Sequence, residues 1–73
     1  MYQLKEEARK LIKEKYRISY LTEKTGVTRQ YISMIVNKKQ TCSKTIAYYI
    51  TKAIDSESEI KDYFIRLKWK IVL

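Results

Sequence analysis

Apolar residues recur with helical spacing along most of the chain and predict a compact all-α domain. In the first segment, Leu4, Ala8, Leu11 and Ile12 fall on one face, while lysines and glutamates occupy the other. The chain has no Pro, one Gly and no low-complexity linker, so residues 1–73 are expected to form a single domain. Five short helices are expected in succession, over about residues 3–15, 18–25, 29–37 and 44–54, and from residue 56 onwards.

Polar residues between these segments indicate where the helices begin and end. Gly26 follows the second helix, and a glycine there supplies the left-handed conformation of a sharp turn at little steric cost. Side-chain oxygens of Ser and Thr cap the first free N–H groups of a helix. The expected caps are Ser19, in place of the weakly capping Arg17, for the helix over 18–25, Thr28 for 29–37, Ser43 or Thr41 for 44–54, and a capping box of Ser56 with Glu59 for the last helix.

The C-terminal residues 65–73 fit two templates. Their apolar side chains alternate with Arg and Lys, which is typical of a strand, but Ile60, Phe64, Leu67 and Ile71 also follow helical spacing. We expect a helix that ends near Phe64 and a strand after it. An exposed strand with an apolar face is an aggregation site, so the expected partner is a second copy of the chain. The predicted homodimer contacts are Leu67, Trp69 and Ile71; alternatively, Leu67 and Trp69 complete the core of a monomer.

The charge balance favours a polyanionic partner. Sixteen basic and eight acidic residues give a net charge of +8, and the sequence pI is about 9.7. Residues 18–42 have the highest ratio of basic to acidic charge, with four basic residues and one acidic residue. Nucleic acid and an anionic membrane surface both fit such a chain, and a solvated lysine-rich surface is the alternative interpretation.

Several kinds of site are excluded by composition. The chain lacks His and has one cysteine, Cys42, so a zinc site, a histidine triad and an internal disulfide are not expected. We expect no enzyme activity and no cofactor, and we interpret Cys42 as an incidental loop thiol. No apolar run approaches the roughly 18 residues of a membrane span. The N-terminus is too charged for a signal peptide, which predicts a cytoplasmic protein.

The helix expected over 29–37 has an outward face suited to DNA. At 100° per residue, Arg29, Gln30, Ser33 and Asn37 share one arc with Met34, opposite an apolar arc, and none of them is acidic. Arg can pair with guanine and Gln with adenine, so the expected base contacts are Arg29, Gln30 and Ser33. The expected phosphate contacts are Ser19, Thr28, Tyr31, Asn37, Lys38, Lys39 and Lys44. The alternative is that these side chains are exposed to solvent without binding DNA, or, for Tyr31, that the side chain is partly buried.

The run LTEKTGVTRQYISMIVNKK resembles the helix-turn-helix of Cro- and phage-repressor-type (XRE-like) regulators. The matching positions are Leu21, Gly26, Val27, Thr28, Ile32, Ser33, Ile35 and Asn37. The departures are Ile18 in place of a phosphate-binding Gln, Thr22 in place of Ala, and Val36 and Lys38 in place of Glu and Gly. The resemblance covers about residues 3–65. It implies a five-helix, lambda-repressor-like fold, with a helix-turn-helix over about 18–37, and sequence-specific binding of operator DNA by a homodimer.

The expected function is therefore a double-stranded DNA-binding transcriptional regulator, acting as a repressor on palindromic half-sites. A bacterial or phage origin follows from the family analogy alone. The same fold could instead bind protein, as an antitoxin, an anti-defence protein or a replication partner. A membrane-surface peptide fits less well, because the charges do not segregate onto one face and the turn motif would have no purpose. No membrane partner and no small-molecule ligand are expected.

Overall fold

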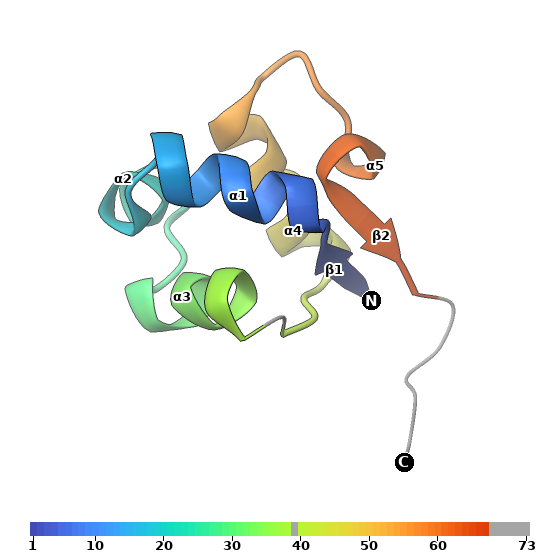
Figure 1. Ribbon diagram of the computed structural model, residues 1–73, viewed down its shortest axis with the longest axis horizontal. Helices are drawn as coiled ribbons and strands as arrows, with labels where there is room; N and C mark the ends of the chain where they lie inside the picture. Colours follow the sequence, from blue (N-terminus) through green and yellow to red (C-terminus); the bar gives the residue numbers. More distant parts are fainter. Residues whose placement is uncertain (39, 68–73) are drawn as a thin grey trace.

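A computed structural model describes residues 1–38 and 40–67, and this part of the chain is mostly helical (Figure 1). The helices surround one apolar core, and a small two-stranded sheet lies beside them. In chain order the elements are β1 (Tyr2–Leu4), α1 (Glu6–Lys15), α2 (Ile18–Thr25), α3 (Arg29–Asn37), α4 (Lys44–Ile54), α5 (Ile60–Tyr63) and β2 (Phe64–Arg66).

The expectation of an all-α fold is wrong at the N-terminus. Residues 2–4 form strand β1, which pairs antiparallel with β2 in the register Tyr2 to Arg66 and Leu4 to Phe64. Helix α1 therefore begins at Glu6 and not near residue 3. Leu4 is buried in the sheet, and its spacing from Ala8 fits a helix equally well, so the apolar pattern could not distinguish the two.

The strand expected after Phe64 is present over Phe64–Arg66, and one of its edges pairs within the same chain. β2 pairs with β1 of its own chain, so it does not need a second copy to satisfy that edge. Beyond β2, the N–H of Leu67 donates to the carbonyl of Met1 over 2.8 Å. Two of the predicted dimer contacts, Trp69 and Ile71, lie outside the described residues, as does the predicted phosphate contact Lys39.

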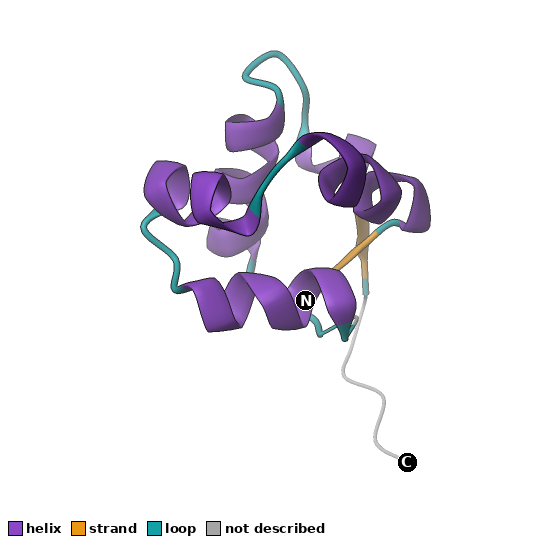
Figure 2. Ribbon diagram, turned by 60° about the vertical axis from the view of Figure 1, so that its left-hand side comes forward, coloured by secondary structure: helices purple, strands orange, loops and turns teal. Residues whose placement is uncertain are grey.

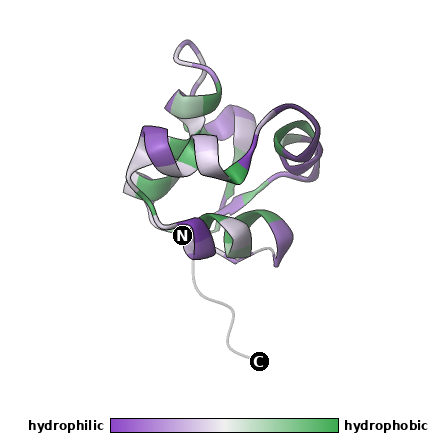
Figure 3. Cartoon of the chain, turned by 90° about the vertical axis from the view of Figure 1, so that its left-hand side faces the viewer, coloured by the Kyte–Doolittle hydropathy of each residue, from purple (hydrophilic) through white to green (hydrophobic). Residues whose placement is uncertain are grey.

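The core is built from the inward faces of the helices and closed by the sheet. Phe64 of β2 is among the largest fully buried side chains, and the residue is 2% exposed. Figure 3 shows hydrophobic and hydrophilic stretches alternating along the helices, as expected when each helix turns one face inwards. The buried apolar residues of the helices are Ala8, Ile12, Leu21, Ile32, Ile35, Val36, Ala47, Ile50 and Ile54.

Helices α2, α3 and α4 have the expected bounds, and local signals define the end of α2 and the beginnings of α3 and α4. Gly26 has φ +76°, in the left-handed region, and ends α2. The Thr28 hydroxyl accepts the N–H of Tyr31 over 3.2 Å, and the Ser43 hydroxyl accepts the N–H of Ile46 over 3.3 Å. These contacts confirm Gly26, Thr28 and Ser43 in their predicted roles.

Two other predicted caps are wrong. Ser19 lies inside α2, whose N-cap position is held by Arg17 without a side-chain cap. Before α5, the carboxylate of Asp62 accepts the N–H of Glu59 over 2.8 Å, so the capping residue is Glu59 and not Ser56.

The loop before α5 explains that second error. Asp55 accepts the N–H of Glu57 over 3.0 Å and the hydroxyl of Ser58 over 2.9 Å. The ammonium of Lys52 donates to the carbonyls of Ser56 and Ser58 at 3.2 and 2.8 Å. These bonds hold residues 55–58 as a turn, and α5 begins only at Ile60.

None of the helices in the described part of the chain has the length and apolarity that crossing a bilayer requires.

Candidate nucleic-acid interface

Helix α3 forms one edge of the molecule. Its inward side chains Ile32, Ile35 and Val36 are buried, which fixes the rotation of the helix about its axis. In Figures 1 and 2, α3 runs along the lower edge, and no other element within the described residues covers its outer side. Residues 26–28 join it to α2, and the two helices pack against each other. The outward residues of α3 are thus held on a rigid element and are accessible to a large partner.

The predicted base contacts lie on this uncovered side. Arg29 and Gln30 are exposed in the first turn, and Asn37 is exposed in the last turn. Ser33, between them, is half-buried and accepts a hydrogen bond from the Asn37 amide over 3.1 Å. The Ser33 hydroxyl can still donate its hydrogen, and the Asn37 carbonyl oxygen can still accept. This one helix face therefore carries donors and acceptors over its whole length.

The first turn of α3 also offers backbone donors. The Thr28 hydroxyl accepts the N–H of Tyr31, and the Thr28 carbonyl accepts that of Ile32 over 3.1 Å. The N–H groups of Arg29 and Gln30 have no hydrogen-bond acceptor within the described residues. Free N–H groups and the positive end of the helix dipole favour an anion such as a phosphate near this turn.

Acidic residues are absent from the part of the chain that contains this face. Residues 24–54 include Lys24, Arg29, Lys38, Lys39, Lys44 and Lys52 but no Asp or Glu. The acidic residues cluster instead in α1, at Glu23, and in residues 55–62. The loop that begins at Asp55 lies at the top of Figure 1, at the opposite end of the view from α3. The electrostatic potential around α3 is therefore expected to be positive.

The remaining predicted phosphate contacts lie on several elements. Ser19 is exposed on α2, the helix that packs on α3. Lys38 is exposed directly after α3, whereas Tyr31 is half-buried and packs against the core, which supports its alternative interpretation as a packing residue. Lys44 is exposed as the first residue of α4, where it also lines a groove beside the sheet.

One candidate contact was not found from the sequence. Lys24 is exposed in the last turn of α2, next to the 26–28 turn that precedes α3. Its ammonium lies 5.7 Å from the centre of the Tyr20 ring, in cation–π range. Lys24 is the first residue of the segment 24–54, which contains no Asp or Glu, and this position could have identified it as a candidate from the sequence.

The described residues show no cluster of side chains that could bind a metal ion. Within residues 1–38 and 40–67, no three His, Cys, Asp or Glu side chains are placed so that they could hold a metal ion. The Cys42 thiol is buried, and its pKa is raised to about 11 because burial disfavours the thiolate.

Comparison of the chain with protein-family models, curated proteins and solved structures finds no match. A functional assignment therefore depends on the geometry and charge of the residues described above.

Proposed function

We propose that this protein is a sequence-specific double-stranded DNA-binding regulator that inserts α3 into the major groove. The observation that carries the proposal is the uncovered face of α3, where Arg29, Gln30, Ser33 and Asn37 lie in a segment without acidic residues. An α-helix fits the major groove of B-DNA, where each base pair presents a distinct pattern of donors and acceptors. The α2–turn–α3 unit would act as a helix-turn-helix, with α3 as its recognition helix.

The side chains divide the recognition task by chemistry. Arg29 would pair through its planar guanidinium with the two acceptors of a guanine, and Gln30 would pair with an adenine. Thr28, the N–H groups of the first turn and Lys38 would bind phosphates, which fixes the register of α3 but carries no sequence information. Lys24 adds a further cation beside the 26–28 turn.

A homodimer would place two copies of α3 in successive major grooves, with half-site centres about 34 Å apart. Roughly five phosphate contacts per protomer would give a slope near −9 in log K against log salt concentration. Occupancy of a promoter by such a dimer would exclude polymerase, and the protein would thereby act as a repressor.

The first test is a selection of bound duplexes from a random pool at near-physiological salt. Wild type should enrich a palindromic site, and Arg29→Ala/Gln30→Ala should lose that enrichment. The control is Lys13→Ala, which also removes one positive charge from an exposed helical position, but on α1. It should select the same site as wild type.

A second measurement separates base contacts from phosphate contacts. Lys38→Ala should weaken binding to all sequences alike and reduce the salt slope by about one unit per protomer. If wild type enriches no sequence and retains all duplexes alike in a salt-sensitive way, the proposal is overturned. A protein partner for α3 would then be favoured.

The dimer is tested separately by sedimentation of the full-length chain. Trp69→Ala/Ile71→Ala should give monomers, while β2 and its pairing with β1 stay intact because that pairing involves residues 64–66. An unchanged sedimentation mass would exclude these residues from the interface.

A further inference from the structure

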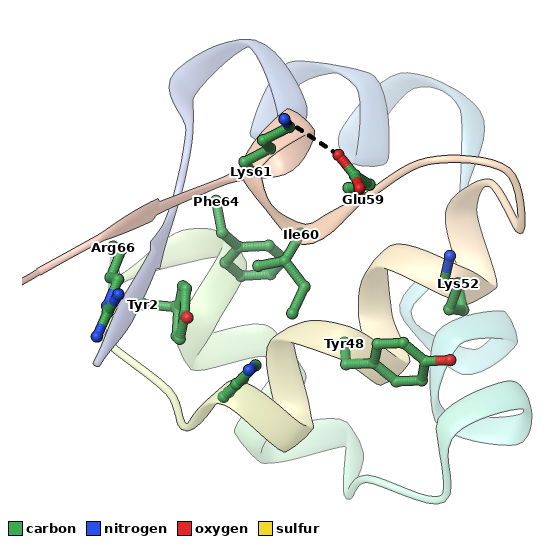
Figure 4. A pocket seen from close by; sticks show the side chains of 9 residues that line it. Tyr2, Tyr48, Lys52, Glu59, Ile60, Lys61, Phe64 and Arg66 are labelled. Atoms are coloured by element: carbon green, nitrogen blue, oxygen red, sulfur yellow. Dashed lines mark ion pairs between the residues drawn. The ribbon is translucent and has the colours of Figure 1, made fainter.

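A groove of about 510 Å³ lies between α4, α5 and the sheet (Figure 4). It is assembled from residues far apart in the sequence, since Tyr2, Tyr48 and Phe64 all line it. Small-molecule sites in proteins occupy about 300–1,000 Å³ and are lined mainly by apolar and aromatic side chains with a few polar groups. The groove has this size and this character.

The walls of the groove are apolar and aromatic. Phe64 is almost fully buried at 2% exposure and forms part of the core, so that wall is rigid. Ile60 and Tyr2 are half-buried, and Tyr48 is 48% exposed on α4. An apolar ligand body placed here would remove water from Tyr48 and Ile60, which favours binding.

The charged groups around the groove are mostly basic, with four cations and one carboxylate. The carboxylate of Glu59 is 3.2 Å from the ammonium of Lys61, so this pair neutralises itself. The ammonium of Lys52 already donates to two loop carbonyls. Lys44 and Arg66 also line the groove, and neither side chain has a hydrogen-bond or ion-pair partner within the described residues.

We infer that this groove binds a small amphipathic anion, with an aromatic or aliphatic body and one carboxylate, sulfonate or phosphate head. The body would contact mainly Tyr48 and Ile60, since Phe64 is almost fully buried, and the head would pair with Lys44 or Arg66. A protein partner is disfavoured by size, because stable protein interfaces bury roughly 800 Å² on each side, much more than one such groove offers. The inference does not depend on DNA binding.

The test uses two probes that differ in charge. 1-Anilinonaphthalene-8-sulfonate is a naphthyl anion, and N-phenyl-1-naphthylamine has the same rings without the sulfonate. Fluorescence titration of the full-length protein should show saturable binding of one anion per chain, at least about tenfold tighter than the neutral probe, as expected for a charge-assisted contact. Equal affinity for the two probes would overturn the assignment of an anion site.

Matched variants locate the site. Lys44→Gln/Arg66→Gln should weaken the anionic probe by about tenfold, while Lys10→Gln/Lys13→Gln removes the same charge from α1 and should have no effect. Tyr48→Ser should weaken both probes. Tyr49→Ser changes the neighbouring, equally exposed tyrosine, which does not line the groove, and should leave both affinities unchanged.

Amide chemical-shift mapping in the wild type provides a readout that does not depend on any variant folding. Saturable shifts should concentrate on residues 44–48 and 59–66. Shifts centred elsewhere, no saturable binding, or equal losses for the Tyr48 and Tyr49 variants would each overturn the inference.

Discussion

Tyr2 and Cys42 hold each other through two reciprocal backbone hydrogen bonds. The N–H of Tyr2 donates to the carbonyl of Cys42 over 2.9 Å, and the N–H of Cys42 donates to the carbonyl of Tyr2 over 2.8 Å. β1 thus lies between β2 on one side and Cys42 on the other. This bridge anchors the segment between α3 and α4 immediately before the Ser43 cap, so the first residues of the chain help to position Lys44.

The buried Cys42 thiol should be unreactive in the folded protein. Its side chain is 2% exposed, and burial raises its pKa from 9.0 to about 11. Because the thiolate is the nucleophile, a disulfide reagent at pH 8 should modify Cys42 only after the chain opens. Reaction should be slow in buffer and complete within the mixing time in denaturant. Rapid, stoichiometric labelling of the native protein would contradict the buried position.

The same shift predicts a loss of stability at alkaline pH. The unfolded thiol ionises near pH 9, whereas the folded thiol ionises only near pH 11. The folded state therefore binds the proton more tightly, and this contribution to the free energy of unfolding declines as the pH rises through that window. Subtracting the pH profile of Cys42→Ala from that of wild type should isolate the effect, because the two chains differ only at residue 42. A flat difference between pH 8 and 11 would contradict it.

The loop before α5 should be sensitive to acid through Asp55. Its pKa is lowered by the N–H of Glu57 and then by the hydroxyl of Ser58, while nearby Lys52 contributes less. A lowered folded-state pKa means that this carboxylate stabilises the fold above the unfolded value near 3.8 and that the stabilisation is lost as the pH falls through the folded value. Asp55→Ala should lower the melting temperature at pH 7, and the difference from wild type should shrink below pH 4.

Glu57→Ala is the matched control for Asp55→Ala. It removes the same charge from the same loop, but the Glu57 side chain makes no hydrogen bond or ion pair within the described residues. An equal loss of stability in both variants would show that loop charge, and not the Asp55 hydrogen bonds, is responsible.

Gly26 should tolerate asparagine better than alanine. Its φ of +76° lies in the left-handed region, and a Cβ atom built there meets no atom within 4 Å. The cost of Gly26→Ala is therefore conformational and not steric, and it should be about 1 kcal/mol. Asn adopts the left-handed conformation more readily, so Gly26→Asn should cost less. Urea unfolding of the two variants decides the order, and an equal loss would contradict the conformational explanation.

The sequence predicted the helices where the deciding signals are local. Thr28, Ser43 and Gly26 each act within a few residues, and α2, α3 and α4 have the expected bounds. Strand β1 was missed because its partners are remote: Tyr2 pairs with Cys42 and Arg66. The capping box at Ser56 was wrong because Asp55 and Lys52 hold that loop through competing hydrogen bonds.

The two candidate sites, the α3 face and the groove, also differ in whether local sequence predicts them. The outward face of α3 could be derived from residues 29–37 alone, because helical periodicity fixes which side chains share an arc. The groove could not be derived, because β1, α4, α5 and β2 each supply part of it. The expectation of no small-molecule ligand stays untested, and the sequence could not have revealed a groove whose lining comes from separate elements.

Removal of the Thr51 hydroxyl should stabilise the fold. Its side chain is fully buried in α4, and its hydroxyl has no hydrogen-bond partner within the described residues. Burial of an unpaired hydroxyl costs free energy, so Thr51→Val, which keeps the shape, should stabilise the fold by about 1 kcal/mol. For a domain of this size, the melting temperature should rise by about 4–8 °C. Thr45→Val on the exposed side of α4 is the control and should change it little. A destabilised Thr51→Val variant would mean that the hydroxyl is hydrogen-bonded in solution.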